Sequence, residues 1–146
     1  MPFRRLGTPT THVLQPLRLF LPPNPDSVPA ARRAATDAAR TLLGPEQTPS
    51  LALLVSEVVT NALLHGDSDQ DVEVVIAVDD ALVRVEVCDR GDGFVPAPKA
   101  LDHDGDGGYG LYLVEQLSDR WGWSRSDCTR VWFEMDANGA AAGSAV

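Results

Sequence analysis

The sequence predicts an α+β fold, a two-layer sandwich in which three helices pack on a mixed, mostly antiparallel sheet of about five strands. Two long segments have the apolar spacing of helices, and a central pair of segments alternates apolar and polar residues as strands do. Hydrophobic residues make up 44% of the 146 positions, which is enough for one packed core. Helices on one face of a sheet are a stable way to bury such surfaces.

The N-terminal half contains one predicted strand and two predicted helices. Alternating apolar residues predict a strand over 11–21, and the proline-rich run at 22–25 ends it because proline cannot donate to a strand ladder. A segment rich in Ala, Arg and Leu predicts a helix over 28–43. A second helix is predicted over 50–65, with Gly66 as its C-cap.

The C-terminal half begins with a change of period from 3.6 to 2. Residues 72–78 and 83–87 alternate around a two-aspartate turn and predict a β-hairpin. A third helix is predicted from Leu111, and two last strands are predicted over 121–124 and 130–135.

The two ends of the chain lack a periodic pattern. Residues 1–10 are polar and contain proline, so we expect a flexible N-terminus. Residues 137–146 are small and unpatterned, so we expect a disordered tail. One domain is therefore predicted over residues 11–136.

The charge balance excludes some classes of partner. Lys and Arg total 12 against 21 Asp and Glu, which gives a formal net charge of −9. Nucleic-acid binding and adhesion to an anionic membrane both need a basic face, so neither is expected. No apolar run approaches the roughly 18 residues that span a bilayer, and no signal peptide opens the chain, so we expect a cytoplasmic protein.

The two cysteines lie far apart in the sequence. Cys88 and Cys128 have no CxxC spacing, and without a secretory signal a disulfide is not expected. Strand alternation places Cys88 on the side of the sheet that faces away from the helices, either outward or at an interface.

A polar stripe interrupts the second predicted helix, which is otherwise apolar almost all round. Glu57, Asn61 and His65 are spaced i, i+4 and i+8 and therefore share one face. Burying a carboxylate without a partner is costly, so this face is expected to line a cleft or a ligand. A solvated seam with a hydrogen bond between Glu57 and Asn61 is the alternative, and His65 also fits a buried, hydrogen-bonded histidine.

Six of the 12 glycines fall between Gly91 and Gly110. Asp89 precedes them and shares the parity of the inward valines of its strand, so it points toward the helices. Gly91 and Gly93 follow and permit a close backbone approach. The alternative is a turn aspartate that accepts hydrogen bonds from its own backbone.

The second glycine group, from Gly105 to Gly110, leads into the third predicted helix. Backbone N–H groups at a helix start favour phosphate. A dinucleotide-binding motif fails on context, because no strand precedes the glycines. A calcium loop fails because its twelfth position would be Leu113 instead of a carboxylate. No Walker A string occurs in the sequence.

Taken in order, these three stretches resemble the GHKL ATPase superfamily, of the gyrase, Hsp90, histidine kinase and MutL type. The stretches are Glu57-x-x-x-Asn61-x-x-x-His65-Gly66, Asp89-x-Gly91-x-Gly93, and Gly108-Tyr-Gly110-Leu111. The short chain looks most like the RsbW-type anti-sigma factor serine/threonine protein kinases. The resemblance implies a Bergerat ATP-binding fold and binding of ATP and Mg²⁺.

The resemblance also implies a role for each matched residue. Glu57 would be the catalytic general base, Asn61 would coordinate Mg²⁺, and Asp89 would accept the adenine amino group. Residues 95–107 would form the ATP lid. The remaining nucleotide-binding positions would be His65, Gly91, Gly93, Gly108, Tyr109, Gly110 and Leu111.

One position departs from the family pattern. Small members commonly have a Lys-Thr pair before the last strand, whose threonine helps to hold the adenine. This chain has Thr129-Arg130, so the threonine is either replaced by Arg130 or displaced by one residue.

The resemblance implies three partners: a STAS-domain anti-anti-sigma protein carrying the acceptor serine, a sigma factor, and a second copy in a homodimer. Arg32, Arg33 and Arg40 are candidates for contacting an acidic partner, or they form a solvated helix face. The alternative function is an ATP-gated binding module that transfers no phosphate.

Overall fold

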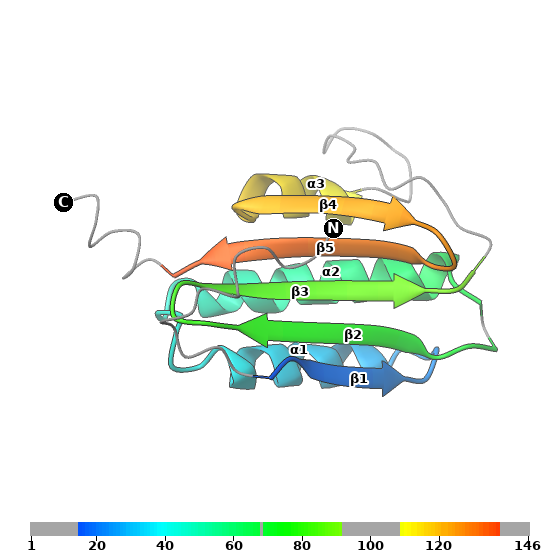
Figure 1. The fold of residues 1–146 in the computed structure, drawn as a ribbon, viewed down its shortest axis with the longest axis horizontal. Helices are drawn as coiled ribbons and strands as arrows, with labels where there is room; N and C mark the ends of the chain where they lie inside the picture. Colours follow the sequence, from blue (N-terminus) through cyan, green and yellow to red (C-terminus); the bar gives the residue numbers. More distant parts are fainter. Residues whose placement is uncertain (1–14, 68, 92–108, 138–146) are drawn as a thin grey trace.

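A computed structural model describes residues 15–67, 69–91 and 109–137 of the chain. Three helices cover one face of a five-stranded sheet whose order is β1-β2-β3-β5-β4 (Figure 1). The elements in chain order are β1 Leu17–Leu21, α1 Ser27–Ala38, α2 Thr48–His65, β2 Val72–Val78, β3 Leu82–Asp89, α3 Tyr109–Leu117, β4 Arg120–Arg125 and β5 Thr129–Asp136. The predicted fold class is confirmed, and every pairing between the described strands is antiparallel.

The core lies between the sheet and the helices. Alternate residues of β3 and β5 face it, and the cross-strand pair Val85 and Phe133 is fully buried. The α2 helix supplies Leu51, Leu54 and Val55, which are also fully buried. An almost wholly apolar helix fits this central place, since it packs against α1, α3 and the sheet.

The boundaries differ from prediction at the first strand and after the first helix. The β1 strand begins at Leu17 instead of residue 11, and residues 15 and 16 are described but lie outside it. The α1 helix ends at Ala38 instead of residue 43. A turn follows, in which the N–H groups of Leu42 and Leu43 both donate to the carbonyl of Ala39. This turn places Leu43 in the core. The apolar spacing of the sequence therefore continues to Leu43, and the predicted helix was longer than the observed one.

The predicted flexible N-terminus at 1–10 lies outside the described residues, as do residues 138–146 of the predicted disordered tail at 137–146. The first residue of that tail, Ala137, is instead buried, and its N–H donates to the carbonyl of Ala81 at 2.8 Å.

A disulfide joins Cys88 and Cys128, which contradicts the expectation from the sequence. The two residues are 40 apart in sequence, but the pairing of β3 with β5 brings their Cα atoms to 5.9 Å. Cys88 lies beside Glu86 and Arg130 in a pocket on the sheet face away from the helices, as its parity predicted. Each cysteine immediately precedes a residue of the site described below.

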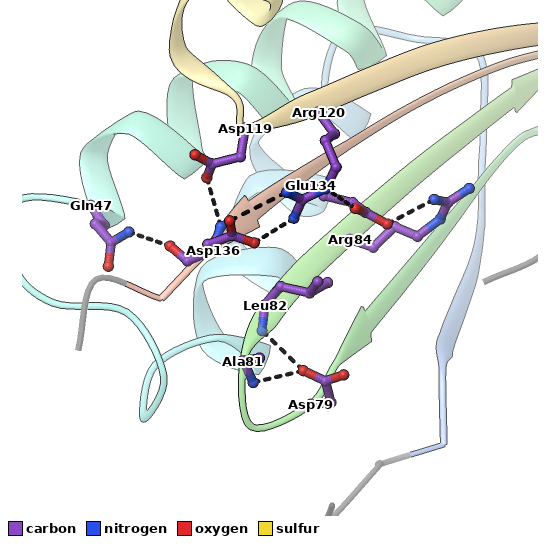
Figure 2. A network of polar contacts seen from close by, with 9 residues as sticks. All are labelled: Gln47, Asp79, Ala81, Leu82, Arg84, Asp119, Arg120, Glu134 and Asp136. Carbon is purple, nitrogen blue, oxygen red and sulfur yellow. Dashed lines mark hydrogen bonds and ion pairs between the residues drawn. The ribbon is translucent and has the colours of Figure 1, made fainter. Parts of the chain in front are cut away.

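A charged network on that outer face anchors the far end of the sheet (Figure 2). Arg84 is 3% exposed and donates to Glu134 at 3.0 Å, with its guanidinium 4.3 Å from the centroid of the Trp132 ring. Arg120 bridges Glu134 and Asp136. The network therefore ties β3, β4 and β5 together at the end opposite to Asp89.

None of the helices in the described ranges is long and apolar enough to cross a membrane.

Candidate functional site

The first two sequence motifs meet where β3 ends against the C-terminus of α2. A Cβ atom at Gly91 would lie 2.3 Å from the carbonyl oxygen of His65 and 2.6 Å from the Cα of Gly66. A Cβ at Gly66 would lie 3.3 Å from the Cβ of Asp89 and 2.5 Å from the carbonyl oxygen of Ala62. Both glycines are therefore needed for close approach, and Gly66 ends the helix with an extended backbone.

Asp89 is a nearly buried carboxylate at this junction, with 3% of its surface exposed. Its Oδ1 accepts a hydrogen bond from the backbone N–H of Gly91 at 3.1 Å, so the turn-aspartate alternative holds for one of its two oxygens. Burial raises the pKa of Asp89, while the Gly91 N–H, His65 and Arg125 act in the opposite direction. A carboxylate held in this way is suited to accept a hydrogen bond from a ligand.

The polar stripe of α2 runs toward the same junction. Asn61 is 7% exposed, and its Nδ2 has no hydrogen-bond partner among the described residues. The alternative in which this amide donates to Glu57 is therefore not found. An unpaired buried donor costs about 1–3 kcal/mol, so it indicates a group that the site is built to receive.

Glu57 lies one turn before Asn61 and is half-buried. Burial raises the pKa of its carboxyl group. A carboxylate with a raised pKa is a better general base near neutral pH than an exposed one.

The third motif is described only from Tyr109 onward. The α3 helix begins at Tyr109, two residues earlier than predicted, and Gly110 lies in its first turn. The side chain of Leu111 is 2% exposed and belongs to the core, so only its backbone at the helix start remains for phosphate binding. Gly93, Gly108 and the predicted lid at 95–107 lie outside the described residues.

Thr129 is a site residue whose place the sequence left open. It is fully buried and pairs with Asp89 across β3 and β5. Arg130 lies on the other face, where its Nε donates to Glu86 at 2.8 Å. The threonine is therefore displaced by one position and not replaced. The alternation of Thr129 with Val131 and Phe133 was the signal that could have shown it.

Magnesium would have few protein ligands in this arrangement. The described part of the chain contains no group of three His, Cys, Asp or Glu side chains that could hold a metal ion. Asn61 has a side-chain oxygen of the kind that Mg²⁺ takes as a ligand, whereas its unpaired Nδ2 can only donate a hydrogen bond, for example to a phosphate oxygen. Mg²⁺ is commonly held by one or two protein oxygens, substrate phosphates and water, so the residues fit it.

A buried acceptor at the end of β3 and an unpaired buried amide on α2 are features expected of a nucleotide-binding α+β sandwich. The family model for the histidine kinase-like ATPase domain matches residues 21–135. The chain therefore belongs to the histidine kinase-like ATPase family, within the GHKL superfamily, and forms an ATP-binding module of that kind. A search of curated proteins found no match.

The burial of Asp89 leads to a prediction about stability. Its pKa is raised in the folded state above the ordinary value of 3.8, so the native state keeps a proton that the unfolded state has lost. The free energy of unfolding therefore falls as the pH rises from the pKa of Asp89 in the unfolded state to its higher pKa in the folded state. Without nucleotide, Asp89→Asn is expected to be more stable than the wild type at pH 7, and this advantage shrinks near pH 4.

Thermal unfolding at the two pH values measures this effect. Asp71→Asn, at an exposed aspartate before β2, is the matched control and should leave the melting temperature unchanged. A variant Asp89→Asn that is less stable than the wild type at pH 7 would contradict the prediction.

Proposed function

We propose that this protein is an ATP- and Mg²⁺-dependent protein serine kinase that phosphorylates a STAS-domain anti-anti-sigma partner and sequesters a sigma factor. The observation that carries the proposal is Glu57, a half-buried carboxylate with a raised pKa, one turn from Asn61 on the same helix. An ATP-binding module needs no such base for binding alone. Family membership supports the use of ATP.

Each of these residues would make a different contact with the bound nucleotide. Asp89 would accept the adenine amino group, and the backbone at the start of α3 would face the phosphates. Asn61 would hold Mg²⁺ through its Oδ1, and the ion when bound supplies charge neutralisation at the phosphates. These contacts position the nucleotide, which is most of what phosphoryl transfer requires.

Glu57 would complete the reaction by accepting the proton of the partner's serine hydroxyl. The serine oxygen then forms a bond to the terminal phosphorus of ATP, and the bond from that phosphorus to the bridging oxygen breaks, which releases ADP. Burial of Glu57 raises its proton affinity, so it accepts this proton more readily than an exposed glutamate would.

The experiment is incubation with labelled ATP and the cognate STAS partner. Glu57→Gln is expected to lower the rate of serine labelling by about 100-fold or more, while the affinity for ATP changes little. Glu115→Gln, at an exposed glutamate of α3, is the matched control. Full labelling by Glu57→Gln would refute the role of Glu57. ATP binding by a wild type that labels no serine would instead indicate the binding module without phosphate transfer.

Partner contact is proposed through exposed arginines of α1 and of the turn that follows it. Arg32 is half-buried and donates to Ser56 of α2 at 2.8 Å, so it holds the two helices together. Arg33 and Arg40 are exposed and are the candidates for an acidic surface of the STAS or sigma partner. A homodimer, a role in transcription regulation and a cytoplasmic location belong to the same proposal.

A further inference from the structure

Three side chains of different chemistry form a row across the end of the sheet. In the strand register, Arg125 of β4 pairs with Thr129 of β5, and Thr129 pairs with Asp89 of β3. Directly paired residues point to the same face, so the row lies on the helix-facing side at the candidate nucleotide site. It places a guanidinium, a hydroxyl and a carboxylate in that order.

The contact between the first two fixes the direction of the hydroxyl. Arg125 Nη1 donates to Thr129 Oγ1 at 2.7 Å. A guanidinium has donors and no acceptor, so the threonine hydroxyl cannot direct its own proton back to it. The proton of this fully buried hydroxyl therefore points away from Arg125, on the side where Asp89 lies.

The row thus presents a hydrogen-bond donor beside an acceptor. Thr129 offers its O–H, and Asp89 offers a carboxylate whose pKa burial raises, while the Gly91 N–H, His65 and Arg125 act against that rise. The Watson–Crick edge of adenine has an amino donor next to a ring-nitrogen acceptor, which complements this pair directly or through a water. The edge of guanine has an acceptor next to a donor, which is the reverse.

We propose that Arg125 is a positioning residue that holds the Thr129 hydroxyl as a donor and thereby sets the preference of the site for a 6-aminopurine over a 6-oxopurine. The proposal rests on the nucleotide site described above. Without the guanidinium, the hydroxyl is free to rotate and can accept as well as donate. The site then loses part of its discrimination, because a polar site rejects a mismatched ligand only while its groups are held in place.

The test compares the affinities for two nucleotides, because the affinity for one nucleotide alone does not report the preference of the site. Calorimetric titrations with Mg·ATP and Mg·GTP give the ratio of their dissociation constants. Arg125→Ala is expected to reduce the preference for ATP by about tenfold, the scale of one or two hydrogen bonds. Arg125→Lys, which keeps a donor, should retain most of it. Arg18→Ala, at an exposed arginine of β1 on the other face of the sheet, should retain all of it.

A second variant tests the coupling to the hydroxyl. Thr129→Val should lower the preference by a similar factor, and adding Arg125→Ala to it should lower it no further. If Arg125 had only a structural role, Arg125→Ala would bind both nucleotides more weakly by the same factor. The ratio of the two dissociation constants would then be unchanged, which would overturn the proposal. A wild type that binds neither nucleotide would overturn the proposed function itself. If the wild type binds ATP and Arg125→Ala has the same ratio of dissociation constants as the wild type, only the role of Arg125 is overturned.

Discussion

Replacing Cys88 by serine is expected to lower the free energy of unfolding by about 4 kcal/mol under oxidising conditions. The disulfide to Cys128 closes a segment of 40 residues that includes α3 and β4. Without the bond, the unfolded chain recovers the conformational freedom of that closed loop. Chemical denaturation of the variant and the wild type without reductant measures the difference.

Two controls separate the bond from the side chain. Cys128→Ser should lose the same amount as Cys88→Ser, and the double variant should lose no more than either. Adding a thiol reductant should bring the wild type to the level of the variants. Equal stability of wild type and Cys88→Ser without reductant would contradict this role. In a reducing compartment such as the proposed cytoplasm, the less stable dithiol form would prevail.

Replacing Gly91 by alanine is expected to lower stability by about 3 kcal/mol and to weaken nucleotide binding strongly. The new Cβ would lie 2.3 Å from the His65 carbonyl oxygen and 2.6 Å from the Gly66 Cα, both of which are backbone atoms. Neither can rotate aside, so the end of β3 must move away from α2. That movement displaces Asp89 from the polar stripe of the helix.

Gly44→Ala is the matched control for this variant. Among the described residues, a Cβ at Gly44 would meet only the flexible Glu46 side chain, 3.3 Å from its Oε1. Chemical denaturation and Mg·ATP titration of both variants give the comparison. A Gly91→Ala protein with wild-type stability and ATP affinity would show that the two motifs need not touch.

The hairpin shows why much of the fold could be predicted from the sequence. Apolar and polar residues alternate in β3, and in β2 Val72, Val74, Ile76 and Val78 recur at every second position. The structure places the two strands at Val72–Val78 and Leu82–Asp89. The turn is specified locally, since Asp79 Oδ1 accepts from the N–H groups of Ala81 and Leu82 at 2.7 and 2.9 Å (Figure 2). Local pattern and local turn chemistry agree, and such elements are predictable.

The disulfide and the pairing of Thr129 with Asp89 required information that the sequence does not carry locally. Both depend on the register of β3 against β5, two strands separated by α3 and β4. Strand alternation gives the face of each residue, but not which residue lies opposite it. The polar stripe of α2 and the inward direction of Asp89 were predicted because each depends on the period of a single element. The charge of −9 did not exclude a phosphate ligand, since backbone N–H groups and Mg²⁺ can bind it.

The most direct test of the account is a calorimetric titration of Mg·ATP into the wild type and Asp89→Asn. We expect one binding site on the wild type and an affinity lower by about 30- to 100-fold in the variant, because a charged acceptor is lost from a nearly buried position. Retained folding of the variant, shown by its thermal unfolding, confirms that the loss is local. Absence of ATP binding by the wild type, or equal binding by Asp89→Asn, would contradict the account.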